Sequence, residues 1–269
     1  MSVLKVFSYL PNPRVWKAVI ASRLLGLEVE VVGDKPNQLG TWLWDFNPRP
    51  LAEEERTAGN PNARQGRRGF SGELFKTDAF LSAHPFGTVP AAFSPDGSVG
   101  IFESNSILRS VVRAAPEGSS LYGTSIYEAS RVDSFLDANL VFAREAQVYL
   151  LDVDTLTQEG YDRMSSAYEF YLSGVEATLA VSSYLVGNNL TIADISFVCD
   201  FAQFLREGHY EDSLRNKGFS LITEDGLTRY PRAFEHMLEL NSRREFSEVM
   251  GSYLNWYRLK LDSVEVSTK

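Results

Sequence analysis

The sequence predicts an α/β domain followed by an all-helical domain. Apolar residues alternate at 3–9 and again at 27–32, and the segment between them, 14–26, has helical apolar spacing, which is the pattern of a β-α-β unit. From about residue 121 onward, only helical spacing recurs. Between the two halves, "APEGSSLYG" at 115–123 gathers Pro, Gly and Ser, as linkers do. We therefore expect one domain over 1–114 and a second over 121–269.

The first domain is expected to have the element order β-α-β-β-β-α. Gly26 ends the first helical segment, and Gly is the usual C-terminal stop of a helix. The strand after it should return parallel to the first strand, since a helix connects them. Two apolar runs, 89–95 and 99–104, surround the turn sequence Pro95-Asp96-Gly97 and predict a β-hairpin. The segment 105–115, "NSILRSVVRAA", then predicts a closing helix.

Residues 40–82 form an insertion that is too long for an ordinary connection. It is rich in Pro, Gly, Asn and charged residues, so we expect a long irregular stretch. Two interpretations are open: a functional lid or interface element, or a passively packed insertion. The choice depends on its aromatic side chains, which are Trp42, Trp44, Phe46, Phe70 and Phe75.

The second half is expected to be a helical bundle. Four segments carry apolar residues every three to four positions over several turns, and these are 125–151, 160–181, 191–207 and 230–253.

The composition excludes several functional classes. A formal charge of −9 argues against binding the phosphate backbone of nucleic acids, which needs clustered Lys and Arg. The one basic stretch, Arg64 to Arg68, follows an acidic run and is interpreted as a solvated loop. One cysteine, Cys199, excludes an internal disulfide, is expected in the core, and suits the reducing cytosol. The three histidines lack ligand spacing, so no metal site is expected.

No apolar run approaches the roughly 20 residues that cross a bilayer. The first 12 residues also lack the apolar stretch of a signal peptide. We therefore expect a soluble, cytoplasmic protein without a membrane partner.

Three separated motifs resemble the glutathione transferase superfamily. Thr88-Val89-Pro90 opens the third strand, and Glu103-Ser104 ends the fourth, as in the thioredoxin-like domain of that superfamily. The segment 184–199, "YLVGNNLTIADISFVC", resembles the part of the helical domain in which a Thr-x-x-Asp capping box starts a central helix. The resemblance spans nearly the whole chain and implies that two-domain fold. It gives Thr191 and Asp194 a structural role.

The resemblance also implies a site for glutathione, used as a co-substrate. A proline before a strand can follow a cis peptide bond, which leaves the preceding backbone facing the cleft. Val89, before Pro90, would then pair through its backbone with the cysteinyl part of glutathione. Glu103 would bind the γ-glutamyl ammonium, and the Ser104 hydroxyl and N–H would bind its carboxylate at the positive end of a helix. Asn105 is the neighbouring residue. Taken alone, a Ser at a helix start is more simply an N-cap, worth about 1 kcal/mol.

Glutathione chemistry needs a group that stabilises the thiolate. The residues near the first helix start that could serve are Ser8, Tyr9, Asn12 and Arg14. The run "PNPRVWK" resembles the elongation factor 1B gamma group and, more loosely, the bacterial β-aryl etherases, which favours Asn12 and then Arg14. The alternative for Arg14 is a surface charge. Cysteine-dependent, disulfide-exchanging classes are disfavoured because no cysteine lies here.

The resemblance places a second, hydrophobic aromatic substrate against the first long helix of the bundle. Phe135, Asn139 and Phe142 share one face there by their spacing, and the alternative for them is interface core. The specific expectation is glutathione-dependent cleavage of β-aryl ether bonds in lignin-derived aromatics, and the broader one is conjugation to an aromatic electrophile. A non-catalytic scaffold, or a subunit that pairs with a paralogue, stays open. A dimer, either a homodimer or a heterodimer, is expected by resemblance.

Overall fold

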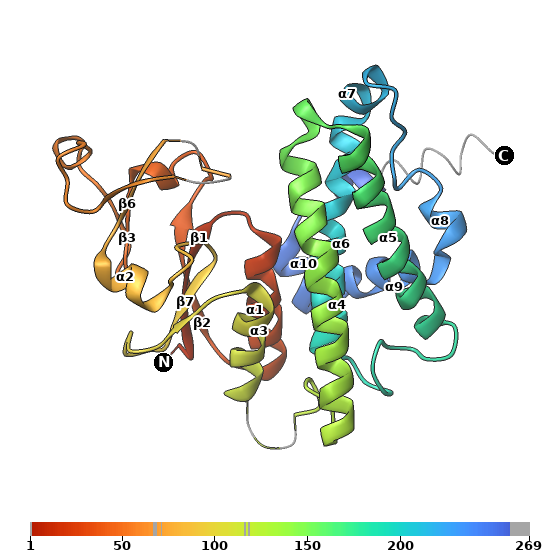
Figure 1. Cartoon of the computed structure of the whole chain (residues 1–269). Helices are drawn as coiled ribbons and strands as arrows, with labels where there is room; N and C mark the ends of the chain where they lie inside the picture. The colour runs from red at the N-terminus through yellow and green to blue at the C-terminus, as the bar shows by residue number, and fades with distance from the viewer. Residues whose placement is uncertain (1, 67–68, 71, 116, 118, 259–269) are drawn as a thin grey trace. The chain divides into compact units, whose positions relative to one another are not determined.

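The computed structural model describes residues 2–66, 69–70, 72–115, 117 and 119–258. Arg67 and Arg68 of the basic stretch, parts of the expected linker, and the end of the chain after residue 258 lie outside these ranges. The chain divides into two compact units, Met1–Pro116 and Glu117–Lys269 (Figure 1). Within the described ranges, no helix has the length and apolar character to span a membrane, and no group of three or more His, Cys, Asp or Glu could hold a metal ion.

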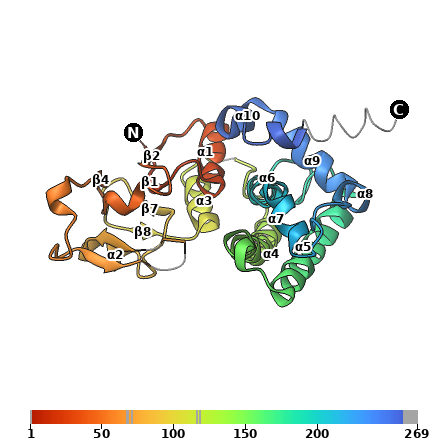
Figure 2. The ribbon, with the colours of Figure 1, turned by 90° about the horizontal axis from the view of Figure 1, so that it is seen from above.

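The N-terminal unit contains the predicted sheet, with strand order β2-β1-β7-β8. Its elements are β1 Leu4–Tyr9, α1 Pro13–Leu25, β2 Val29–Asp34, β7 Ala91–Phe93, β8 Gly100–Ile101 and α3 Ser104–Arg113. Strand β2 runs parallel to β1, whereas β7 runs antiparallel to both β1 and β8. Helices α1 and α3 lie together on one face of this sheet (Figures 1 and 2). The predicted α/β arrangement of this unit is therefore confirmed.

Both ends of α1 follow from the sequence. The Asn12 side chain caps the helix by accepting from the Arg14 N–H at 3.0 Å, and Pro13 occupies the first turn, where its missing N–H costs nothing. Gly26 ends the helix with φ 66°, a left-handed conformation that glycine adopts without steric cost. The predicted stop at Gly26 is confirmed.

The insertion is more ordered than the sequence predicts. It forms a second sheet of order β4-β3-β6-β5, followed by a short helix. The elements are β3 Trp42–Trp44, β4 Arg49–Pro50, β5 Ala63–Gln65, β6 Glu73–Lys76 and α2 Asp78–Ala83. The expectation of an irregular stretch was wrong because strands of two to four residues are too short to show periodicity, and β3 pairs with β6 across some thirty residues of chain.

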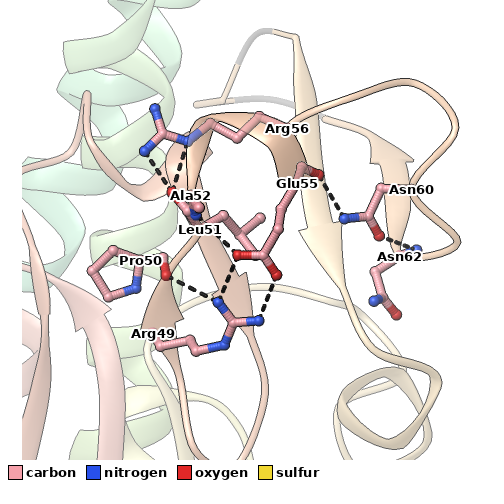
Figure 3. A network of polar contacts seen from close by, with 8 residues as sticks. All are labelled: Arg49, Pro50, Leu51, Ala52, Glu55, Arg56, Asn60 and Asn62. Carbon is pink, nitrogen blue, oxygen red and sulfur yellow. Dashed lines mark hydrogen bonds and ion pairs between the residues drawn. The ribbon is translucent and has the colours of Figure 1, made fainter.

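A polar network fixes the loop after β4 (Figure 3). The Arg49 guanidinium donates to both Glu55 carboxylate oxygens, at 2.9 and 2.6 Å, and the Ala52 N–H donates to the same carboxylate at 2.9 Å. These bonds lower the pKa of Glu55 to about 2. Asn60 donates to the Glu55 carbonyl at 2.7 Å, so the loop returns toward β5 in a defined path.

The aromatic residues of the insertion form its core. Trp42 and Trp44 pack with Phe7 and Phe93 of the first sheet in one buried cluster. Phe75 is also buried, and the rings of Phe46 and Phe70 pack against this cluster. These contacts favour the packed-insertion interpretation, since the aromatic side chains are occupied within the N-terminal unit.

The C-terminal unit is helical, as predicted. Its helices are α4 Ile126–Leu151, α5 Gln158–Leu179, α6 Ile192–Phe204, α7 Glu211–Asn216, α8 Gly226–Arg229, α9 Pro231–Ser242 and α10 Arg244–Met250. The expected single helix over 230–253 is broken at Arg243, whose backbone is extended with φ −69° and ψ 144°. Helices α7 and α8 were not predicted, since each is too short for a periodic pattern.

The predicted capping box at the start of α6 is confirmed. The Asp194 carboxylate accepts from the Thr191 N–H at 2.9 Å and from the Thr191 hydroxyl at 3.0 Å. It also accepts from the Leu185 N–H at 2.9 Å and lies 2.9 Å from Nε2 of His236. Asp194 thus joins α6 to the preceding loop and to α9. Cys199, one turn further on, is buried in the core, as expected.

Candidate functional site

The two motifs of the N-terminal unit, Val89-Pro90 and Glu103-Ser104, lie at the same end of its hairpin. Val89 and Pro90 lead directly into β7, and the peptide bond between them is cis, as expected. Strand β7 pairs with β8 in the register Ala92 opposite Ile101. Glu103 and Ser104 follow two residues after that pair, where the chain leaves β8 and enters α3.

Glu103 has an unusual backbone conformation. Its φ of 66° and ψ of 125° make it the one residue other than glycine with positive φ in the described part of the chain. Such a conformation costs on the order of 1–3 kcal/mol for a residue with a Cβ. The side chain is exposed, and its carboxylate has no hydrogen bond or ion pair to any described residue. The strain therefore serves no polar contact of the Glu103 side chain with the described residues of this unit.

Ser104 and Asn105 form the first turn of α3 and are both buried. The N–H groups of Ser106 and Ile107 bond to the Glu103 carbonyl at 2.9 and 3.0 Å. The Ser104 N–H has no acceptor among the described residues, so it stays available at the positive end of the helix. The simple N-cap interpretation of Ser104 is wrong, because Glu103 occupies the cap position and the Ser104 hydroxyl caps no N–H.

One residue that contacts the candidate site, Lys17, was not predicted from the sequence. The Lys17 ammonium, on α1, donates to the Ser104 hydroxyl at 3.2 Å and to the Asn105 side-chain carbonyl at 2.9 Å. Lys17 is 1% exposed. A lysine is usually interpreted as a solvated position of an amphipathic helix. The available signal was its position in "RVWKAVIA", where apolar residues flank it on both sides.

The four thiol-activating candidates have different surroundings. Asn12 is fully buried: its Oδ1 caps α1, and its Nδ2 donates to the Ser8 hydroxyl at 2.9 Å. Ser8 is fully buried too. The Tyr9 ring packs against the aromatic cluster of the insertion, on the other face of β1. Arg14, in the first turn of α1, is half-buried and so the more accessible of the two favoured candidates.

The candidates on α4 face two environments. Asn139 donates to the Tyr171 hydroxyl at 3.1 Å and accepts from the Ser196 hydroxyl at 2.8 Å, so its amide links three helices. Phe142 is 1% exposed and stacks on Tyr171 with ring centroids 5.0 Å apart. Both side chains are buried among the helices of the C-terminal unit. Phe135 is partly exposed and lies 5.0 Å from the Arg131 guanidinium.

The insertion holds the loop that leads into Val89. The Lys76 ammonium, at the end of β6, donates to the Gly87 carbonyl at 2.7 Å and lies 4.6 Å from the centre of the Trp44 ring. Gly87 has φ 57°, and a Cβ there would approach Lys76 Nζ to 3.3 Å. In the same loop, burial between the rings of Phe80 and Phe93 lowers the pKa of His84 to about 4.

Comparisons with known proteins agree with this arrangement. No family model matches the chain. It is similar to a probable elongation factor 1-gamma 1 of Arabidopsis thaliana, 28% identical over 184 residues, which cover 65% of this chain and 40% of that protein. It is also similar to glutathione S-transferase F9 of the same plant, 28% identical over 130 residues, which cover 45% of this chain and 60% of that protein. The chain thus spans about two fifths of the length of the elongation factor relative.

A solved structure matches nearly the whole chain. A glutathione S-transferase from Methylobacillus flagellatus, with glutathione bound, superposes with a TM-score of 0.62 and 14% identity, covering 91% of this chain and 98% of that one. The chain has the glutathione S-transferase fold. The resemblance predicted from the sequence is confirmed at this level, for a thioredoxin-like unit followed by a helical unit.

Proposed function

We propose that the N-terminal unit binds glutathione at the start of α3. The observation that carries the proposal is the conformation of Glu103. Glu103 combines this positive φ with an exposed carboxylate, and the next residue is Ser104; neither the Glu103 carboxylate nor the Ser104 N–H has a hydrogen-bond partner among the described residues. An acceptor next to a donor at a helix N-terminus suits a group that carries both an ammonium and a carboxylate, as the γ-glutamyl end of glutathione does. Backbone strain of this kind collects at ligand sites.

The remaining contacts of glutathione follow from the same geometry. The Ser104 hydroxyl and N–H would bind the γ-glutamyl carboxylate, and Glu103 would bind the ammonium. Val89, partly buried before β7, would offer its backbone N–H and C=O to the cysteinyl part. The thiol would then point toward the first turn of α1, where Arg14 is the accessible donor and Asn12 the buried one.

We further propose that the chain transfers glutathione to a hydrophobic aromatic electrophile. A hydrogen bond or positive charge from the start of α1 would stabilise the thiolate. The specific reaction we propose is β-aryl ether cleavage, in which the sulfur forms a bond to the carbon that bears the ether. The carbon–oxygen bond breaks, and the phenolate leaves with the bonding electrons and takes a proton from water. Phe135, the partly exposed ring on α4, is the first residue to test for contact with the acceptor.

Calorimetric titration of the purified chain with glutathione tests the binding site. The unmodified chain should show saturable binding, and Ser104→Ala should weaken it by about tenfold, because a hydrogen bond to a charged group is lost. Ser110→Ala is the matched control, since the Ser110 hydroxyl bonds within α3, to the Ser106 carbonyl at 2.9 Å. Equal affinities of the two variants would remove Ser104 from the site.

A second function, assembly without catalysis, has its own supporting observation. Asn12 and Ser8 are fully buried and bonded to each other, which is the arrangement of a structural helix start. The similarity to a probable elongation factor 1-gamma 1 is consistent with this alternative. The partner would be a second copy or a paralogue. Turnover of aryl ethers and of a generic aromatic electrophile, measured beside the mass of the protein in solution, distinguishes the two functions: glutathione binding without turnover supports assembly.

A further inference from the structure

Lys17 links two helices through residues far apart in the sequence. It lies in the middle of α1, and its ammonium reaches the first turn of α3, where it donates to the Ser104 hydroxyl at 3.2 Å and the Asn105 side-chain carbonyl at 2.9 Å. Ser104 and Asn105 are, like Lys17, almost completely buried. Burial of an ammonium is costly unless hydrogen bonds compensate for lost hydration, so the position of Lys17 depends on these acceptors.

The chemistry of an ammonium determines how Ser104 uses its hydroxyl. A lysine ammonium has three donors and no acceptor, so the Ser104 oxygen must accept from it. A hydroxyl has one hydrogen to donate, and this hydrogen is then left for another acceptor. The same bond to Asn105 fixes its amide with the oxygen toward Lys17 and the NH2 group away from it. The Lys17 ammonium thus orients two side chains in the first turn of α3, so that the Ser104 hydroxyl hydrogen and the Asn105 NH2 group point away from it as donors.

We propose that Lys17 is a positioning residue for carboxylate binding at the start of α3. By occupying a lone pair of the Ser104 oxygen, it leaves the hydroxyl hydrogen and the adjacent Ser104 N–H as two donors for one carboxylate. The positive charge of the Lys17 ammonium, 3.2 Å from the Ser104 hydroxyl, also attracts a bound carboxylate. The role rests on the proposed glutathione site, whose γ-glutamyl carboxylate is the ligand considered.

A double-mutant cycle on glutathione affinity tests this role. Four proteins are titrated by calorimetry: the unmodified chain, Lys17→Met, Ser104→Ala and the double variant. Because Lys17 acts through the Ser104 hydroxyl, Lys17→Met should weaken binding by about tenfold in the unmodified background and much less when Ser104 is already Ala. Lys5→Met is the matched control: Lys5 lies on β1 and bonds to Asn47 at 2.9 Å, away from α3. Thermal unfolding of each variant separates a loss of stability from a loss of affinity.

Two results would overturn the proposal. If the loss of glutathione affinity in the double variant equals the product of the fold-losses in the two single variants, Lys17 acts independently of Ser104, and only the glutathione site remains supported. A folded, unmodified chain that does not bind glutathione would overturn both the site and this role. If Lys17→Met does not fold, the Lys17 ammonium is followed by NMR in the unmodified chain labelled with ¹⁵N-lysine. Its signal should shift along the calorimetric saturation curve, and a signal unchanged at saturation would contradict the proposal.

Discussion

Replacement of Glu103 by Gly should stabilise the protein while it weakens glutathione binding. Glu103 has φ 66° and ψ 125°, a conformation that glycine adopts freely and that a residue with a Cβ adopts only at an energetic cost. Its carboxylate is exposed and has no bond to a described residue, so removal of the side chain costs no folded-state contact. The substitution should therefore raise the stability of the protein and lower its affinity for glutathione, as expected where backbone strain is part of a ligand site.

The magnitude follows from two terms. Relief of the strained backbone contributes about 1–3 kcal/mol. Glycine loses more conformational entropy on folding, which offsets about 0.5–1 kcal/mol of that gain. We expect Glu103→Gly to be about 1 kcal/mol more stable than Glu103→Ala, which removes the same carboxylate and keeps the strain. Both variants should bind glutathione about tenfold more weakly, because each lacks the acceptor for the γ-glutamyl ammonium.

Urea unfolding followed by tryptophan fluorescence measures the stability term. Of the four tryptophans, Trp16, Trp42 and Trp44 lie in the N-terminal unit, so the signal reports largely on the unit that holds Glu103. Calorimetric titration measures the affinity term. A Glu103→Gly variant no more stable than Glu103→Ala would refute the strain argument, and unchanged affinity in both variants would remove Glu103 from the site.

Three further predictions concern the surroundings of the site. Burial lowers the pKa of His84 from 6.5 to about 4, so below pH 6.5 the unfolded chain binds a proton that the folded chain does not, and the free energy of unfolding should fall by about 2 kcal/mol by pH 5. In urea unfolding, the stability of His84→Phe should depend less on pH over this range. An equal loss of stability in both proteins would contradict the lowered pKa of His84. Lys76→Met removes the bond to the Gly87 carbonyl, so glutathione should bind several-fold more weakly through the loosened loop before Val89, whereas an affinity equal to that of the Lys5→Met control would show that the insertion does not support the site. Arg14→Ala should lower turnover with little change in glutathione affinity if its guanidinium stabilises the thiolate, and Asn12→Ala should in addition lower the unfolding temperature, since it removes a helix cap worth about 1 kcal/mol; full turnover in both variants would place the thiolate donor elsewhere.

The elements predicted correctly from the sequence are those with local signals. Gly26 marks the end of α1 through its tolerance of positive φ, and Pro95-Asp96-Gly97 marks the hairpin between β7 and β8. The capping box of Thr191 and Asp194 also lies within a single helical turn. Each of these signals depends on neighbouring residues, so one sequence is enough to detect it.

The second sheet could not be predicted because its pairing is not local. Leu43 of β3 pairs with Phe75 of β6, and the strands are too short for alternation to be visible. The aromatic residues were noticed, but their burial against Phe7 and Phe93 depends on the tertiary fold. In the same way, spacing put Asn139 and Phe142 on one face of α4, and only packing against α5 and α6 shows that this face is the core.

The residues of the proposed site differ in how far the sequence indicates them, for a related reason. Glu103, Ser104 and Val89 were identified through motifs that surround them in the sequence. Lys17 was missed because its two acceptors lie on α3, almost ninety residues later in the chain. The preference for Asn12 did not account for its burial, because the bond to Ser8 that encloses its amide depends on how β1 meets α1.

The most direct test of the account is an NMR titration that follows the backbone amide of Ser104 in the ¹⁵N-labelled chain as glutathione is added. The account predicts a saturable downfield shift of the Ser104 N–H, which has no acceptor among the residues that the structure describes, together with a shift at Val89 and little change in the core of the C-terminal unit. Saturation with no change at Ser104 or Val89 would contradict the central claim that this helix start binds the γ-glutamyl group.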